Sequence, residues 1–137
     1  LIGIVGIFIG ITVTQFAQIR NSILTDTNKI YLAEEGYEIV RLLRDENWTN
    51  ISSLSLNTPY FLQVSTTTLS IGGSSELIDD RYNRSFLVQS IYRNGSGNIV
   101  ASTTAGATVD TDAREISVYV GDSNGTSTIK AILVNLP

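Results

Sequence analysis

The sequence lacks three residue types on which many enzyme and metal sites depend: it has no cysteine, no histidine and no methionine. Without cysteine there can be no disulfide bond and no thiolate metal ligand. Without histidine the chain lacks the usual general base near neutral pH and cannot form a conventional Ser-His-Asp triad. We therefore expect no catalytic site, no metal site and no bound cofactor, and a protein that is not an enzyme.

Basic charge is also scarce. Nine Lys and Arg residues face 13 Asp and Glu residues, which gives a formal net charge of −4. A protein whose main partner is nucleic acid needs a basic surface, so nucleic acid is not expected here. Charged residues make up only 16% of the chain. With its abundant Ser and Thr, this composition suits strands with hydroxyl-rich faces in an extracellular protein.

The most prominent feature that is present is the apolar stretch from Leu1 to Arg20, which has no proline and no charge before Arg20. A helix of that length spans roughly 30 Å, about the thickness of a bilayer core. A secretory signal peptide would need a basic stretch before the apolar run and a small-residue cleavage site after it, and neither is present. A buried core helix of a small protein would carry a polar stripe, which is absent from Leu1 to Ile11.

We therefore predict an apolar stem over residues 1–19 and a polar head over residues 20–137. The stem would lie in lipid, in a bundle of identical stems, or in each at different times. The residues expected to pack there are Leu1, Ile2, Gly3, Ile4, Val5, Gly6, Ile7, Phe8, Ile9, Gly10 and Ile11.

Glycines divide the stem. Gly6 and Gly10 have the GxxxG spacing that lets two apolar helices approach closely. The segment Gly10, Ile11, Thr12, Val13 joins glycine to three β-branched residues, all of them poor helix formers. We predict that the helix unwinds over these four residues when stems assemble.

Beyond Arg20 the helical period continues, but only one face stays apolar. We predict one helix from about Leu1 to Asp45, whose amphipathic part, residues 20–46, packs on the rest of the chain. The solvent side should carry two i, i+3 ion pairs, Asp26 with Lys29 and Glu38 with Arg41. The predicted buried face consists of Ile19, Ile23, Ile30, Ala33, Tyr37 and Val40.

The remainder has strand and turn signals and predicts an α+β fold. After a polar connector at residues 47–53, an antiparallel sheet of about four strands should occupy residues 58–137, with Ile116, Val118 and Val120 on its apolar face. Hairpin turns are expected at 94–97 and 122–125, and a further turn at 71–75. The expected strands are 60–64, 86–93, 98–102, 114–120 and 128–134.

These features together resemble type IV pilins and the related pseudopilins. Residues 1–7, LIGIVGI, are similar to the apolar segment that follows the prepilin processing motif. Residues 31–48, YLAEEGYEIVRLLRDENW, resemble the AxEGIExVRxxRDxNW segment of pilin-like proteins from small-genomed bacteria of the candidate-phyla type. Residues 110–120 and the strand ending at Val134 resemble the last hairpin of such proteins. The likeness is specific over residues 31–48 and weaker elsewhere.

One position departs from the pilin pattern. Mature pilins usually begin with Phe and carry Glu at the fifth position, whereas Val5 stands there in this sequence and the first carboxylate is Asp26. Either about six N-terminal residues precede the sequence given, or this chain lacks the acidic residue. In the second case the pairing of that Glu with a neighbouring N-terminal amine does not carry over.

The acidic clusters offer little chemistry. Asp79-Asp80, Asp110 with Asp112, and Glu115 are interpreted as turn-forming or solvated acids. The segment 122–125, DSNG, matches half of a calcium loop but lacks the further ligands and the bidentate Glu. Glu34-Glu35 has two open interpretations, a solvated helix face or a contact with Arg41 or Arg44 of a neighbouring copy. Five N-x-S/T acceptors are candidate glycosylation sites: Asn47, Asn50, Asn83, Asn94 and Asn124.

The resemblance implies a structural subunit of a type IV pilus-like surface filament. Its partners would be membrane lipid and the assembly machinery first, and identical subunits in a helical homopolymer afterwards. The location would be an extracellular filament, reached from a single-pass membrane form. Two alternatives remain open: a pseudopilin or minor pilin of a secretion or DNA-uptake machine, and a membrane-tethered binding module that never polymerises.

Overall fold

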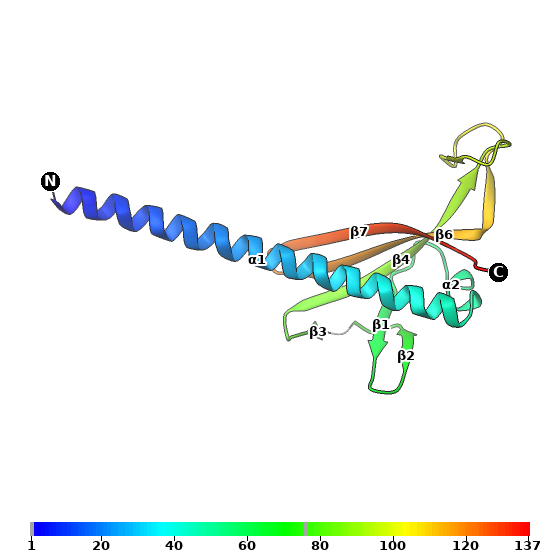
Figure 1. The fold of residues 1–137 in the computed structure, drawn as a ribbon, viewed down its shortest axis with the longest axis horizontal. Coiled ribbons are helices and arrows are strands. Elements are labelled where there is room, and N and C mark those ends of the chain that lie inside the picture. The colour runs from blue at the N-terminus through cyan, green and yellow to red at the C-terminus, as the bar shows by residue number, and fades with distance from the viewer. Residues whose placement is uncertain (1, 76) are drawn as a thin grey trace.

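The computed structural model describes residues 2–75 and 77–137, with side chains from Leu24 onward. One helix, α1 (Ile2–Glu46), begins the chain and is followed by a single-turn helix, α2 (Thr49–Ser52). The second half of α1 packs on an antiparallel sheet, mainly on its strands β6 and β7, so the fold is α+β as predicted. The N-terminal half, blue in Figure 1, extends beyond the sheets.

Within residues 2–75 and 77–137, seven strands form two antiparallel sheets, so the prediction of about four strands is not confirmed. The main sheet has the order β3-β4-β6-β7, and β5 pairs with the far end of β4. A separate hairpin is made by β1 and β2. The strands are β1 (Phe61–Val64), β2 (Leu69–Gly72), β3 (Leu77–Ile78), β4 (Tyr82–Arg93), β5 (Ile99–Val100), β6 (Thr108–Asp122) and β7 (Gly125–Val134).

The two predicted hairpin turns are confirmed. Gly97 has φ of 82° and its N–H donates to the carbonyl of Asn94 at 2.9 Å, which closes the turn after β4. Asp122 pairs with Gly125 across the turn that joins β6 to β7, and Gly125 has φ of 135°. Both positive φ values favour glycine, which has no Cβ to clash. The turn predicted at 71–75 is wrong at its start, because residues 71 and 72 belong to β2.

Four other elements were placed incorrectly or missed. The strand predicted at 60–64 corresponds to β1, which pairs with β2, while Tyr60 just before it forms an isolated antiparallel bridge with Phe86 of β4. Strands β2 and β3 were not predicted, since each is four residues or shorter. The polar connector at 47–53 contains α2, whose Ile51 is fully buried. Two apolar residues, Trp48 and Ile51, in a polar stretch were too weak a signal to predict a packed turn of helix.

The core lies between α1 and the main sheet. Strand β6 contributes Ile116, Val118 and Val120 to the core, and all three are fully buried, as predicted. Strand β4 contributes residues such as Phe86 and Val88. These side chains alternate along strands whose opposite face is polar, which is the usual pattern of an antiparallel sheet covered on one side. The helix residues that cover this face are Lys29, Leu32, Ala33, Gly36, Ile39, Val40 and Leu43.

The predicted helix face was therefore rotated from the true one by about 100°, the turn made by one residue. Ala33 and Val40 are buried and Tyr37 is half-buried, but Ile30 is 46% exposed and its prediction is wrong. The side chains of Ile19 and Ile23 lie outside the described residues. The error arose because Lys29 and Gly36, which are not hydrophobic by type, occupy the centre of the buried face.

The α1 backbone is helical without interruption through residues 10–13. This single chain is not an assembled fibre, so unwinding over Gly10, Ile11, Thr12 and Val13 upon assembly stays a prediction. The other stem positions, Ile2 to Ile9, are also helical, while their side chains, like Leu1 as a whole, lie outside the described residues.

Candidate functional site

Lys29 joins α1 to the β6–β7 turn. Its ammonium lies 3.5 Å from Oδ1 of Asp122 and 3.2 Å from Oδ1 of Asp26, and it donates to the carbonyl of Gly125 at 3.3 Å. The Lys29 side chain is only 4% exposed and that of Asp122 only 1%. The Asp26–Lys29 pair therefore exists as predicted, but only Asp26 lies on the solvent side, and the placement of Lys29 there is wrong. The β6–β7 turn encloses the lysine.

Asp122 is held by a second cation. Arg81 donates to Oδ2 of Asp122 through Nε and Nη2, at 3.3 and 3.1 Å, and its Nη2 also reaches Oγ1 of Thr25 on α1 at 3.2 Å. The backbone N–H of Asn124 donates to Oδ1 at 2.9 Å. The pKa of Asp122 is lowered, first by this N–H and then by the two cations, although burial opposes the shift. A carboxylate so occupied is not a free calcium ligand.

A second paired carboxylate lies near the other end of the sheet. The Arg93 side chain and the backbone N–H of Asp112 both donate to Asp110, and in that order they lower its pKa. Asp112 in turn accepts from the side chain of Asn135 at 3.2 Å. Asp79 and Asp80 have φ values of 53° and 52° in an exposed turn closed by the N–H of Arg81. Among the described residues no group of acids could hold a metal ion.

Helix α1 and the sheet approach each other closely at Gly36. A Cβ there would lie 2.8 Å from Cδ of Arg84 and 3.1 Å from Cγ1 of Val118, so only glycine fits without a shift. The Arg84 guanidinium then reaches up to α1, where Nη1 donates to the carbonyl of Leu32 at 3.1 Å and to Glu35 at 3.0 Å. Arg84 is 7% exposed, and these bonds satisfy a charge that would otherwise be costly to bury.

The outward face of α1 carries acids and large apolar side chains. Glu38 pairs with Arg41 at 3.3 Å in the open, as predicted. Arg44 pairs with Asp45 at 2.7 Å and also donates to the carbonyl of Val134 at the end of β7. Arg41 and Arg44 are thus engaged within their own chain, as Glu35 is. For Glu34, which is exposed and makes no ion pair among the described residues, both interpretations stay open.

The five candidate glycosylation sites differ in exposure and in the hydrogen bonds that their side-chain amides make. Asn50 is half-buried and its Nδ2 donates to the carbonyl of Leu43 at 2.9 Å, a bond that an attached sugar would disrupt. Oδ1 of Asn94 accepts from the backbone N–H groups of Ser96 and Asn98, both at 3.0 Å. Glycosylation stays a prediction at all five. The three exposed sites are Asn47, Asn83 and Asn124.

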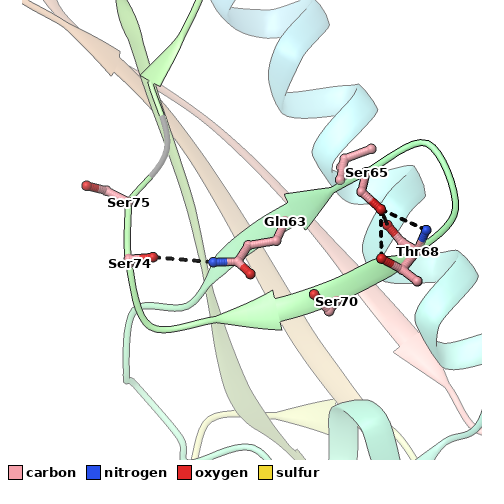
Figure 2. A pocket seen from close by; sticks show the side chains of 7 residues that line it. Gln63, Ser65, Thr68, Ser70, Ser74 and Ser75 are labelled. Carbon is pink, nitrogen blue, oxygen red and sulfur yellow. Dashed lines mark hydrogen bonds between the residues drawn. The ribbon is translucent and has the colours of Figure 1, made fainter.

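A shallow hollow lies on the β1–β2 hairpin, which projects from the body of the head (Figure 1). Its volume is about 380 Å³. Figure 2 shows Gln63 Nε2 donating to Ser74 Oγ, and Ser65 bonded to Thr68. The side chains that line it are Gln63, Val64, Ser65, Thr68, Ser70, Ser74 and Ser75. None of these groups is a strong acid, base or cation, so the hollow offers hydrogen bonds and no acid–base chemistry.

Comparisons with known proteins identify no relative. The chain matches no protein-family model, no curated protein and no solved structure. Within the part of the chain that the structure describes, no helix combines the length and the hydropathy of a candidate membrane span.

Proposed function

We propose that this chain is the structural subunit of a type IV pilus-like surface filament, with a pilin-like head and a polymerising N-terminal stem. The observation that carries the proposal is the division of α1. Residues 29–43 bury one face on the sheet, whereas the earlier half of the same helix extends beyond the sheets (Figure 1). That earlier half is apolar all round in sequence from Leu1 to Ile11. Apolar surface that its own fold does not cover must meet lipid or other copies.

The mechanism is an exchange of apolar surroundings. Before assembly the stem lies in lipid and the head lies outside it. On extraction by an assembly machine, the stem leaves lipid and packs against equivalent stems, so its apolar surface stays out of water throughout. A head-to-tail contact that does not close produces open helical growth. The heads then form the outer layer of the fibre, and identical subunits are the main partner.

The head supplies the rigidity that such a subunit needs. The β6–β7 turn is bound to α1 at Lys29, and the end of β7 is bound to it at Arg44. A pull on the stem is therefore transmitted to the sheet through the buried helix face and through both ends of β7. This arrangement suits a protein that is extracted from a membrane by its stem and then carries load.

Electron microscopy of sheared surface fibres tests the proposal. Fibres that contain this chain should be present on cells that express it and absent from cells whose copy of the gene is deleted. Abundant fibres favour a major subunit. Fibres in which the chain is a trace component favour a minor pilin or pseudopilin. A chain that stays as a membrane-bound monomer under all conditions would replace the proposal with a tethered binding module.

A further inference from the structure

Most cationic side chains of the head form ion pairs with carboxylates of the same chain. Nine Lys and Arg residues occur in the chain, and the structure describes the side chains of eight. Seven of the eight pair with carboxylates of the same chain, and Arg114 donates to three backbone carbonyls. The seven paired cations are Lys29, Arg41, Arg44, Arg81, Arg84, Arg93 and Lys130. Each of these seven charges therefore already has a carboxylate partner within its own chain.

The ninth cation and one exposed acid lie on the same helix. Arg20 has no acidic residue within four positions on either side. Glu34 is exposed and makes no ion pair among the described residues, whereas Glu35 and Glu38 are paired. At 100° per residue, positions 20 and 34 lie within about 40° of each other around the helix and roughly 21 Å apart along it. That separation prevents a bond between them within one copy.

An apolar stripe runs along the same side of α1. Leu24, Tyr31 and Leu42 are 52%, 67% and 54% exposed. They are separated by 7 and 11 residues, a total of 18, which is about five helical turns, so the stripe runs straight along the axis. If a second helix is shifted by the same 14 residues that separate Arg20 from Glu34, position 17 lies opposite Tyr31. This position is Ala17, so a large side chain meets a small residue.

We propose that this stripe is the docking surface for α1 of a second copy, parallel and displaced by 14 residues, with Arg20 of one copy paired to Glu34 of the other. The proposal rests on the filament function and adds the contact that fixes the stagger. Charge selects this displacement, because Arg20 is the only charged residue in the first 25 and most other displacements place it away from a free acid. The apolar stripe supplies the packing, and the ion pair supplies the register.

Charge reversal tests the pair. Arg20→Glu and Glu34→Arg should each lower the yield of sheared fibres by about tenfold, because attraction becomes repulsion at every subunit contact. The double variant restores opposite charges and should return the yield close to that of the parent. Glu46→Arg is the matched control, since it makes the same change at an exposed acid of α1 beyond Leu42, where the stripe ends. Its fibres should equal the parent's in number.

Two results would overturn the pair. One is a double variant with as few fibres as the single variants, and the other is single variants that assemble like the parent. Helical reconstruction of parent fibres gives an independent measurement, since neighbouring α1 helices in contact should be displaced by about 21 Å. If the parent chain makes no fibres, the filament function itself fails. If the parent makes fibres and the swap does not restore them, only this contact fails.

Discussion

The buried ammonium of Lys29 lies 3.5 Å from the buried carboxylate of Asp122, and this pair joins α1 to the β6–β7 turn. Burying either charge alone would be costly, so each charge is stable in its buried position because the other lies beside it. Asp26 and the carbonyl of Gly125 also contact Lys29, and Arg81 and the N–H of Asn124 also contact Asp122.

Asp122→Asn should destabilise the head, because Lys29 and Arg81 would then lack their shared counter-charge in a site with little access to water. We expect the melting temperature, measured by circular dichroism on a fragment that begins at Leu24, to fall by several degrees. Asp79→Asn serves as the control, since Asp79 is exposed and makes no ion pair among the described residues. Equal melting temperatures for parent and Asp122→Asn would show that the pair adds no stability.

Acidic pH should lower the free energy of unfolding of the head because two carboxylates become protonated. Asp122 and Asp110 have folded-state pKa values below the ordinary 3.8. A lowered pKa adds stability above the unfolded-state value, and that stability is lost as pH falls towards the folded-state value. The free energy of unfolding should thus decline from about pH 5 downward and be flat above it. Urea titrations between about pH 3 and 7 measure this, and Asp122→Asn should have a shallower acid slope. A slope unchanged by that substitution would contradict the assignment.

Gly36→Ala should destabilise the fold although alanine is the better helix former. Its Cβ would lie 2.8 Å from Cδ of Arg84, whose far end is fixed by Leu32 and Glu35. We expect a net loss of about 1 kcal/mol, since overpacking costs roughly 1–3 kcal/mol and helix propensity returns about 1. Gly73→Ala is the control, because its Cβ would meet nothing within 4 Å. Chemical denaturation distinguishes the two, and a stabilised Gly36→Ala protein would mean that Arg84 moves freely.

Val118→Asp should prevent stable folding of the head. Val118 is fully buried beneath α1, so the new carboxylate would have no water beside it, and the nearby Arg84 guanidinium is already bonded to Leu32 and Glu35. A loss of roughly 3–5 kcal/mol is expected, which is a large part of the stability of a small domain. Thr128→Asp, at an exposed position of β7, should leave the protein soluble and folded. A Val118→Asp fragment that melts like the parent would show that this face is not the core.

Stem substitutions should separate insertion from assembly. Gly6→Leu keeps the stem apolar but enlarges it where close approach is predicted, so membrane levels should be normal and fibres few. Ile9→Asp should also abolish fibres, because an unpaired charge is costly in an apolar core. Immunoblots of membranes and counts of sheared fibres give the two readouts. If both variants assemble like the parent, the stem is only an anchor and the tethered-module interpretation replaces the filament.

The sequence by itself determined the broad design. The long N-terminal helix, its end near Glu46, the two glycine-containing hairpin turns and the alternating core of Ile116, Val118 and Val120 all follow from local patterns. Such features depend on periods of 3.6 and 2 residues and on turn chemistry, which a short window of sequence contains. The lack of histidine and cysteine also argues, from composition alone, against an acid–base or thiolate metal site.

Tertiary structure decided which side of the helix is buried. A lysine and a glycine occupy the centre of that face because Asp122, nearly a hundred residues away, neutralises Lys29, and because Arg84 fills the space that Gly36 leaves. The residue type at a position predicts whether its side chain is buried only when the side chain is surrounded by water or by apolar groups. Here the partners were a carboxylate and an arginine stem from distant strands, and their positions depend on the sheet having formed.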